Sequence, residues 1–385
     1  LRSGIVWLGV AIGFAALGAL SPSGRSRPFH READGLLPSE GCALVLLRRL
    51  EDAERDGERV LGVIRGVGLS NDGRARSVLA PAVEGQTRAM RLALAQAQVS
   101  PEDVRYVECH ATGTSTGDAI ERQSLEEVYG TRPLALGTLK ANLGHLITVA
   151  GVAGLLKVIA CFERGQLPPA LHAGGAIPGL PPFRLPASPE PWSGRRLAGV
   201  SAFGFGGNNA HLLVEESAGR SAPRPRTPHR RTSLAVVGLE IAIGSAPDRR
   251  AVAEALSGRG LASRRCETFA VDLEGLRFPP NDLRDALAQQ SWLLALARDA
   301  ARGFDLPRER TGVFVGMGCD GVVSGWGLRW RMGALTGTRG DELRELRDEA
   351  APGLRAEHVV GTMPNIAANR LSFQLDAAGP GFTIS

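Results

Sequence analysis

A Pro- and Arg-rich stretch near the middle of the chain constrains the fold more than any other feature. Residues 219–232 read GRSAPRPRTPHRRT and show no apolar periodicity, which is typical of an exposed linker. The chain has 385 residues, so each side of this stretch is long enough for a domain. We therefore predict two units, residues 1–218 and 233–385, joined by a linker over residues 219–232.

The first block alternates strand and helix signals, which favours a layered α/β fold. Strands are predicted at residues 60–69, 104–110, 134–138, 199–203 and 211–214, and a helix at 86–98. Asp118 is expected to start a second helix and to form a capping box with Glu121, and Gly130 to end it. The run from Leu146 is apolar on all sides, so it is predicted to be a central helix.

Composition and charge exclude several classes of protein. Hydrophobic residues make up 43% and charged residues 22% of the chain, which excludes wholesale disorder. The net charge is 45 − 40 = +5, but the arginines alternate with acidic residues as on a solvated helix face, so no nucleic-acid partner is expected. The apolar runs at residues 5–20 and 146–162 are shorter than the roughly 20 residues that span a membrane, and we expect them to be buried core.

The five cysteines contain no CxxC pair, which argues against both a disulfide framework and a zinc site. We therefore expect no metal and a reducing, cytoplasmic setting. The first methionine is Met90, and the chain stops at Ser385 inside an apolar run. We interpret the sequence as an internal piece of a longer protein, and expect exposed apolar surface where its units are incomplete.

The first of three chemistry-bearing segments is ECHATGT at residues 108–114. It places His110 at a strand end beside the hydroxyl groups of Thr112 and Thr114, in a turn that contains a glycine. A proton donor thus lies next to further hydrogen-bond donors. The alternative is a structural histidine.

The second segment is KANLGH at residues 140–145. Only two of the 45 cationic residues are lysines and 43 are arginines, so Lys140 indicates a need for a compact ammonium group. His145 is predicted to lie where a helix begins, and the helix dipole there favours a neutral imidazole. Such an imidazole donates a hydrogen bond to a developing oxyanion.

The third segment is GVSAFGFGGNNAH at residues 199–211. Its four glycines surround Phe203 and Phe205, and would let backbone N–H groups face a ligand. A dinucleotide-binding loop is not indicated here, because a strand and not a helix is predicted to follow.

In this order, the three segments resemble the C-terminal part of β-ketoacyl synthases, the condensing enzymes of fatty-acid and polyketide synthesis. The motifs PFHREADG at residues 28–35 with SEG at 39–41, and NDG at 71–73 with LAP at 79–81, extend the resemblance over residues 1 to about 216. It implies a thiolase-like layered αβαβα fold. It also implies decarboxylative Claisen condensation of a malonyl thioester with an acyl chain, on an acyl carrier protein.

The resemblance also implies roles for single residues. His110 and His145 would hold the malonyl thioester and stabilise its enolate, and Lys140 would support that pair through Glu121. The residues expected to bind substrate are Thr112 and Thr114 on the pantetheine arm, and Phe205, Gly206 and Asn209 in the glycine-rich turn. Phe205 would be the gate, with its N–H in the oxyanion hole.

The family's nucleophilic cysteine has no counterpart in this chain. It would lie upstream of residue 1. Cys109 precedes His110 on a strand and should point to the opposite face, and Cys42 lies in an apolar run where burial raises the thiol pKa. We expect the chain alone to be inactive, and we expect no metal or nucleotide cofactor, because decarboxylation supplies the carbanion and a phosphopantetheine arm carries the substrate.

Residues 233–385 resemble the N-terminal part of the same family. The run SLAVVG at residues 233–238 resembles its opening strand, and TGVFVG at 311–316 its third strand. Two motifs, FPPND at 278–282 and GLRWRM at 327–332, resemble the chain-length-factor unit of polyunsaturated fatty-acid synthases. The resemblance implies that the two units pair, and that a residue other than cysteine stands at the elbow after Ser385.

Two other interpretations stay open. Residues 316–321, GMGCDG, follow a predicted strand with dinucleotide-binding spacing, although the acidic partner would be Asp341 or Glu342 in a charged, helix-like run. Alternatively, the two units form a non-catalytic scaffold. The combination of His110, Lys140 and His145 argues against a scaffold for the first unit.

Overall fold

The computed structural model describes most of the chain. The described residues are 14–39, 41, 43–75, 77–180, 182–217, 235, 237–243, 245–254, 270–317, 321–353 and 355–384. They fall into two compact units, Leu1–Pro228 and His229–Ser385. The predicted linker lies outside the described residues, as do Cys42, Cys266 and Cys319.

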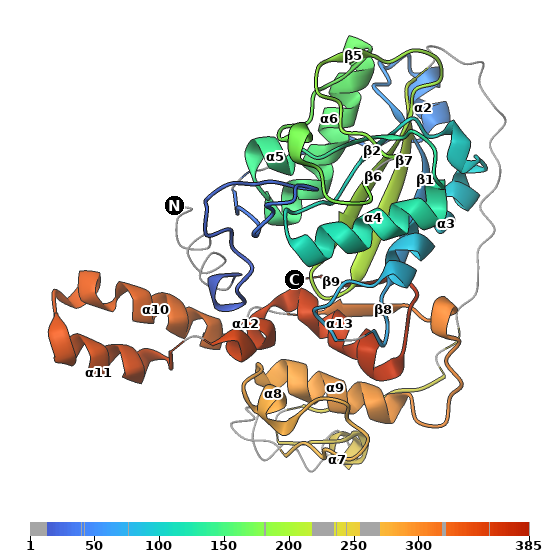
Figure 1. The fold of residues 1–385 in the computed structure, drawn as a ribbon. Helices are drawn as coiled ribbons and strands as arrows, with labels where there is room; N and C mark the ends of the chain where they lie inside the picture. The colour runs from blue at the N-terminus through green and yellow to red at the C-terminus, as the bar shows by residue number, and fades with distance from the viewer. Residues whose placement is uncertain are drawn as a thin grey trace. The chain divides into compact units, whose positions relative to one another are not determined.

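A mixed five-stranded sheet forms the centre of the first unit (Figure 1). Its order is β1 (Val63–Asn71), β7 (Asn208–Glu215), β6 (Leu197–Phe203), β2 (Tyr106–Glu108) and β3 (Ala135–Gly137). The strand β7 is antiparallel to both β1 and β6, whereas β6, β2 and β3 run parallel to one another. All five strands predicted for this block are thereby confirmed, with β2 shorter than expected.

Helices cover both faces of this sheet. On one face, α3 (Val83–Ala97) and α4 (Ser115–Tyr129) pack against β2, β3 and β7, and α6 (Ala150–Arg164) packs on the other face. The helix α3 lies close to β1 because β1 carries glycine at the contact: a Cβ at Gly68 would lie 1.8 Å from the carbonyl oxygen of Ala89. The result is the layered α/β arrangement that the sequence predicts.

Shorter elements complete the first unit. They are α2 (Leu50–Arg55), α5 (Lys140–Leu143), the antiparallel pair β4 (Gln166–Leu167) and β5 (Glu190–Pro191), and the 3-10 turns Pro101–Asp103, Ile147–Val149 and Ala173–Gly175. The turn Ile147–Val149 and α5 both lie between β3 and α6, where the second chemistry-bearing segment runs.

Two predicted helix starts are wrong. The helix α4 begins at Ser115, and neither Asp118 nor Glu121 caps it, because both carboxylates bind backbone N–H groups of other segments. The helix α6 begins at Ala150 after a 3-10 turn, four residues later than expected. Nor is it buried on all sides, as a central helix would be, since Leu156 is 43% exposed.

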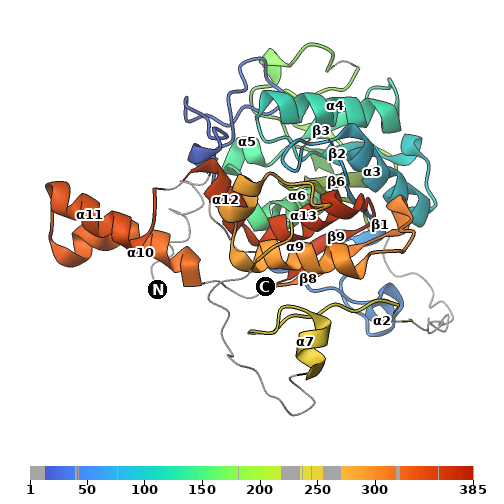
Figure 2. The same cartoon turned by 90° about the horizontal axis from the view of Figure 1, so that it is seen from below.

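The second unit is built on a parallel pair, β8 (Val313–Gly316) and β9 (Gly381–Ile384). Its helices are α7 (Arg249–Glu254), α8 (Pro280–Arg284), α9 (Ala288–Ala300), α10 (Gly321–Thr336), α11 (Gly340–Ala350), α12 (Ala356–Thr362) and α13 (Pro364–Leu375). Leu294 of α9 and Ala368 of α13 pack with Val313 and Val315 in one apolar core. Figure 2 shows α9 and α13 beside the two strands. The described residues of the predicted strand 233–238, which are 235, 237 and 238, are not in a strand.

Large apolar side chains are exposed in both units. Leu44 and Leu46 are 88% and 85% exposed in an irregular segment, and Phe314 of β8 and Ile384 of β9 are 62% and 64% exposed. In the part of the chain described here, no helix is both long and apolar enough to cross a membrane.

Candidate active site

The two histidines of the chemistry-bearing segments come together in the first unit. His110 follows the end of β2, and His145 lies in the loop between α5 and the 3-10 turn that precedes α6. Their ring centroids are 5.6 Å apart, with the ring planes at 79°, and the Phe203 ring at the end of β6 lies 5.9 Å from His110. Two imidazoles thus meet where three separate segments end.

Both imidazoles are held in the neutral form. Burial lowers the pKa of His145 to about 3, with Lys140 adding to the effect, and burial also lowers the pKa of His110 well below its usual value. The Nδ1 atom of His145 accepts the N–H of Ile147 at 2.9 Å, so its proton is on Nε2. The predicted neutral imidazole is present, but its cause is burial and not the start of a long helix.

The predicted acid Glu121 fixes the backbone at His110. Its two carboxylate oxygens accept the N–H groups of His110 at 2.8 Å and of Ala111 at 2.6 Å. The neighbouring Asp118 accepts the N–H of Phe29 at 2.6 Å and of Gly113 at 3.2 Å. Both carboxylates are buried, so each one anchors a loop of the site instead of capping its own helix.

Thr112 and Thr114 lie side by side in this anchored loop. Their Oγ1 atoms are 3.0 Å apart, and both side chains are partly buried. Between them, Gly113 has φ of +82° and its carbonyl accepts the N–H of Gly35 at 2.9 Å. The two predicted substrate-binding hydroxyl groups therefore lie next to the segment that carries the PFHREADG motif.

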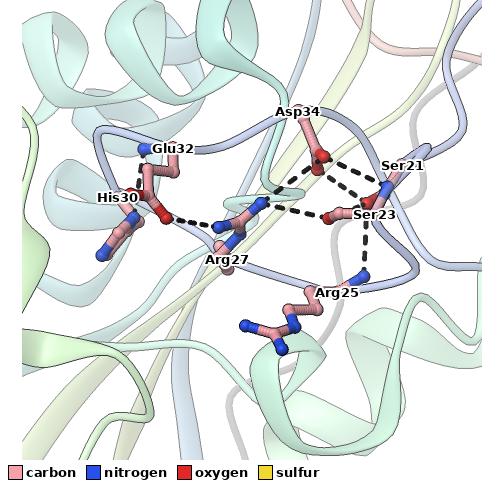
Figure 3. Close-up of polar contacts among 7 residues, drawn as sticks. All are labelled: Ser21, Ser23, Arg25, Arg27, His30, Glu32 and Asp34. Atoms are coloured by element: carbon pink, nitrogen blue, oxygen red, sulfur yellow. Dashed lines mark hydrogen bonds and ion pairs between the residues drawn. The ribbon is translucent and has the colours of Figure 1, made fainter.

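That segment is itself braced by polar contacts (Figure 3). The Arg27 guanidinium donates to Glu32 at 2.5 Å and to Ser23 at 3.0 Å, and it also pairs with Asp34. Asp34 in turn accepts the hydroxyl of Ser21 at 2.6 Å. These contacts close residues 21–34 into a compact loop over Gly113.

Lys140 is buried at the first position of α5. Burial lowers its pKa, and nearby carboxylates oppose that effect, Glu108 first and Glu121 second. Among the described residues, no hydrogen bond or ion pair joins Lys140 to Glu121. The predicted support through Glu121 is therefore at most a longer-range charge effect.

The glycine-rich turn joins β6 to β7 as predicted. Gly206 has φ of +103°, a conformation that favours glycine, and the Phe205 ring lies 6.1 Å from that of Phe14. The Asn209 side chain donates to Asp72 at 2.7 Å and to the carbonyl of Gly207 at 3.1 Å. Asn209 thus holds the turn closed, and a direct contact to substrate stays a prediction for it and for Phe205 and Gly206.

The two described cysteines are poor nucleophiles. Cys109 is 1% exposed, and burial raises its pKa well above the ordinary value, with Glu121 and Glu108 adding to the effect. Burial also raises the pKa of Cys161 to about 11. Neither thiol is activated for acyl transfer.

Sequence reasoning missed one buried ion pair in the site. Glu108, at the end of β2, accepts from Lys157 of α6 at 2.7 Å and from the Tyr106 hydroxyl at 2.7 Å. The scarcity of lysine could have indicated this ion pair, because Lys157 is one of only two lysines in a chain with 43 arginines. Another histidine, His211, is a satisfied core residue between Tyr129 and Ser201, each at 3.0 Å.

Two other kinds of site can be assessed. Across the described residues, no group of three or more His, Cys, Asp and Glu side chains is placed to hold a metal ion. In the second unit, Asp341 and Glu342 lie in the first turn of α11 and not at a strand end, where the acid of a dinucleotide-binding fingerprint belongs.

A histidine pair, a buried lysine and a glycine-rich hairpin thus lie on a layered α/β fold of the thiolase-like class. Residues 61–174 match the family described as beta-ketoacyl synthase, C-terminal domain, and residues 7–53 and 232–385 match beta-ketoacyl synthase, N-terminal domain. The chain belongs to the β-ketoacyl synthase family.

Curated relatives are polyketide synthases. The chain is 43% identical over 220 residues to one phenolphthiocerol/phthiocerol polyketide synthase of Mycobacterium tuberculosis, a match that covers 53% of this chain and 12% of that protein. It is 42% identical over 216 residues to a second phenolphthiocerol/phthiocerol polyketide synthase polypeptide from the same species, covering 54% and 14%. The chain therefore spans only a small part of these relatives.

Solved structures give the same family. The PfaC keto synthase–chain length factor matches with a TM-score of 0.88 and 28% identity, over 97% of this chain and 45% of that one. The ketosynthase from module 6 of the bacillaene synthase from Bacillus subtilis matches with a TM-score of 0.53 and 34% identity, over 54% of this chain and 40% of that one.

Proposed function

We propose that the first unit carries the malonyl-activating half of a β-ketoacyl synthase site, within a polyketide- or fatty-acid-type synthase. The observation that carries the proposal is the pair of neutral imidazoles, His110 and His145, with ring centroids 5.6 Å apart. Two neutral donors at this spacing suit a single thioester oxygen that gains negative charge.

The proposed reaction starts on the malonyl thioester. Its bond to the terminal carboxylate breaks, CO₂ leaves, and the electron pair moves into an enolate whose oxygen accepts hydrogen bonds from the two imidazoles. The enolate carbon then attacks an acyl thioester on a cysteine, and that thiolate leaves. Neither described cysteine suits this last role, so the acyl group is held on a cysteine outside the described residues.

The surrounding residues position these groups. Glu121 fixes the backbone at His110, and the buried Lys140 favours the neutral form of both histidines. Thr112 and Thr114 would donate to the pantetheine arm of an acyl carrier protein. The N–H of Phe205 would donate to the oxyanion that forms when the enolate attacks the acyl thioester. The chemistry requires no metal or nucleotide, since decarboxylation supplies the carbanion.

For the second unit we propose a chain-length factor that pairs with a synthase unit. The match to a keto synthase–chain length factor over 97% of this chain favours this role. In that arrangement, the second unit forms a wall for the growing product and the first unit performs the chemistry.

The test of the proposed function uses a synthase polypeptide that contains this sequence and a nucleophilic cysteine. A malonyl thioester labelled in its free carboxylate should release labelled CO₂, and an acyl thioester should yield a β-ketoacyl product longer by two carbons. A fully folded polypeptide that releases no CO₂ and forms no product would overturn the proposal.

A further inference from the structure

A buried charge cluster lies behind the two histidines. Glu108 is 3% exposed and uses both carboxylate oxygens: one accepts from Lys157 and from Tyr106, each at 2.7 Å, and the other accepts the N–H of Leu139 at 2.5 Å. One carboxylate therefore joins β2, the start of the α5 segment, and α6. Removing such a group would leave several buried polar partners unsatisfied.

The packing leaves room for this cluster at two glycines. A Cβ at Gly137 of β3 would lie 2.0 Å from the Tyr106 hydroxyl oxygen and 3.1 Å from Lys157 Nζ. A Cβ at Gly154 of α6 would lie 3.1 Å from Glu108 Cγ. The neighbouring strand and helix thus approach the cluster at positions that have no side chain.

The cluster is connected to the proposed site on both sides. Glu108 is two residues before His110 in the chain, and its bond to Leu139 holds the residue directly before Lys140. Glu108 and Lys140 also line the same small cavity, together with Ser201 and Gly144. A substitution of Glu108 would therefore affect both the strand that leads to His110 and the segment that carries Lys140.

Several charged and titratable groups surround Lys140. They are Glu108 and Cys109 at the end of β2, Asp118 and Glu121 of α4, Lys157 of α6 through its bond to Glu108, and the two histidines. Glu121 is already bound to two backbone N–H groups. Of the opposite charges, Glu108 has the largest effect on Lys140.

We infer that Glu108 is a positioning residue of the condensing site: it supplies the main counter-charge to Lys140 and ties the Lys140 segment to the strand that leads to His110. Lys157 shares this carboxylate and so limits how strongly it acts on Lys140. This inference rests on the proposed function only for its catalytic consequence, and the charge relation can be tested without any activity.

The test uses ¹³C-lysine NMR on the full 385-residue chain, in which Lys140 is one of only two lysines. Glu108→Gln should lower the pKa of Lys140 by about one pH unit, and Lys157→Gln, which frees the carboxylate, should raise it. Glu121→Gln should lower the pKa of Lys140 by less than Glu108→Gln does. The matched control is Glu126→Gln, on the exposed side of α4, which should leave the pKa of Lys140 unchanged.

Each outcome decides the inference. A decrease of the Lys140 pKa in Glu108→Gln that exceeds the decrease in Glu121→Gln supports it, because a merely structural role of Glu108 gives no reason for that order. No shift in either variant, shifts of the same sign, or a larger decrease in Glu121→Gln would overturn it. If Glu108→Gln does not fold, the double variant Glu108→Gln/Lys157→Gln, which loses both partners of the ion pair, is compared with Lys157→Gln: the pKa of Lys140 should be lower in the double variant, and an equal pKa would overturn the inference.

A second measurement connects this relation to catalysis. In a synthase polypeptide with a nucleophilic cysteine, Glu108→Gln should shift the alkaline limb of CO₂ release to lower pH by about one unit, and Glu126→Gln should not. An unshifted limb would overturn the catalytic part of the inference. If the wild-type polypeptide releases no CO₂, the proposed function fails, while the lysine titration still decides the role of Glu108.

Discussion

Replacing His145 tests whether its Nε2–H is a catalytic donor. The ring does two separable things: Nδ1 accepts the N–H of Ile147 at 2.9 Å, and Nε2 carries the proton. An asparagine can place its oxygen near the position of Nδ1 but cannot reach that of Nε2, whereas a glutamine can place its amide N–H near Nε2. The two variants therefore separate structure from catalysis.

The expected magnitudes follow from these contacts. Loss of one oxyanion donor costs about 10²–10³ in rate, or about 2.7–4 kcal/mol. We expect His145→Asn and His145→Ala to lose that much in CO₂ release from a malonyl thioester, and His145→Gln to lose clearly less. His145→Ala should also lose about 1 kcal/mol of unfolding free energy, because the Ile147 N–H loses its acceptor.

The control is His211→Gln, which changes another buried histidine. His211 bonds Tyr129 and Ser201 and has no proposed contact with substrate, so this variant should lose stability but keep its rate per folded molecule. Rates should be corrected for the folded fraction measured by urea unfolding. Equal rates for His145→Asn and the wild type would refute the assignment of His145 as a donor.

Three further predictions concern neighbouring groups. Lys140→Arg should reduce CO₂ release strongly despite keeping the charge, because the buried site holds a compact ammonium; a wild-type rate would remove Lys140 from the site. Burial raises the pKa of Asp72 from 3.8 to about 7, so its contribution to stability is fully present below pH 4 and is lost as pH rises through 7. Asp72→Asn should therefore stabilise the chain relative to the wild type by about 2–4 kcal/mol more at pH 8 than at pH 4 in urea unfolding, and a pH-independent difference would contradict this. Finally, an acyl thioester should label neither Cys109 nor Cys161 in the folded chain, and mass spectrometry showing one of them as the dominant acyl site would contradict the assignment of both thiols as inert.

Much of the fold could be predicted from local patterns. The five strands of the first unit are short apolar runs between turn signals, and such runs keep their identity in the structure because both faces of the sheet are covered. The start of α6 could not be predicted, since the apolar run begins at Leu146 while the chain first makes a 3-10 turn whose N–H at Ile147 binds His145.

The partners of the acidic residues could not be predicted either. Asp118 and Glu121 have the spacing of a helix start, and only the tertiary fold brings Phe29 and the backbone at His110 within reach of their carboxylates. The same holds for Glu108 and Lys157, which lie 49 residues apart in the chain. Sequence patterns locate the residue types of this site, but the pairing of charges depends on contacts between distant segments.

The proposed mechanism depends most directly on a neutral His145 that carries its proton on Nε2. The measurement is a pH titration of ¹⁵N-labelled histidine in the full chain, with the His145 signals assigned by comparison with His145→Gln. Because burial lowers the pKa of His145 to about 3, the mechanism predicts a neutral ring with the Nε2–H tautomer throughout roughly pH 5–8. A His145 ring that protonates near pH 6, or one whose proton is on Nδ1, would contradict the mechanism.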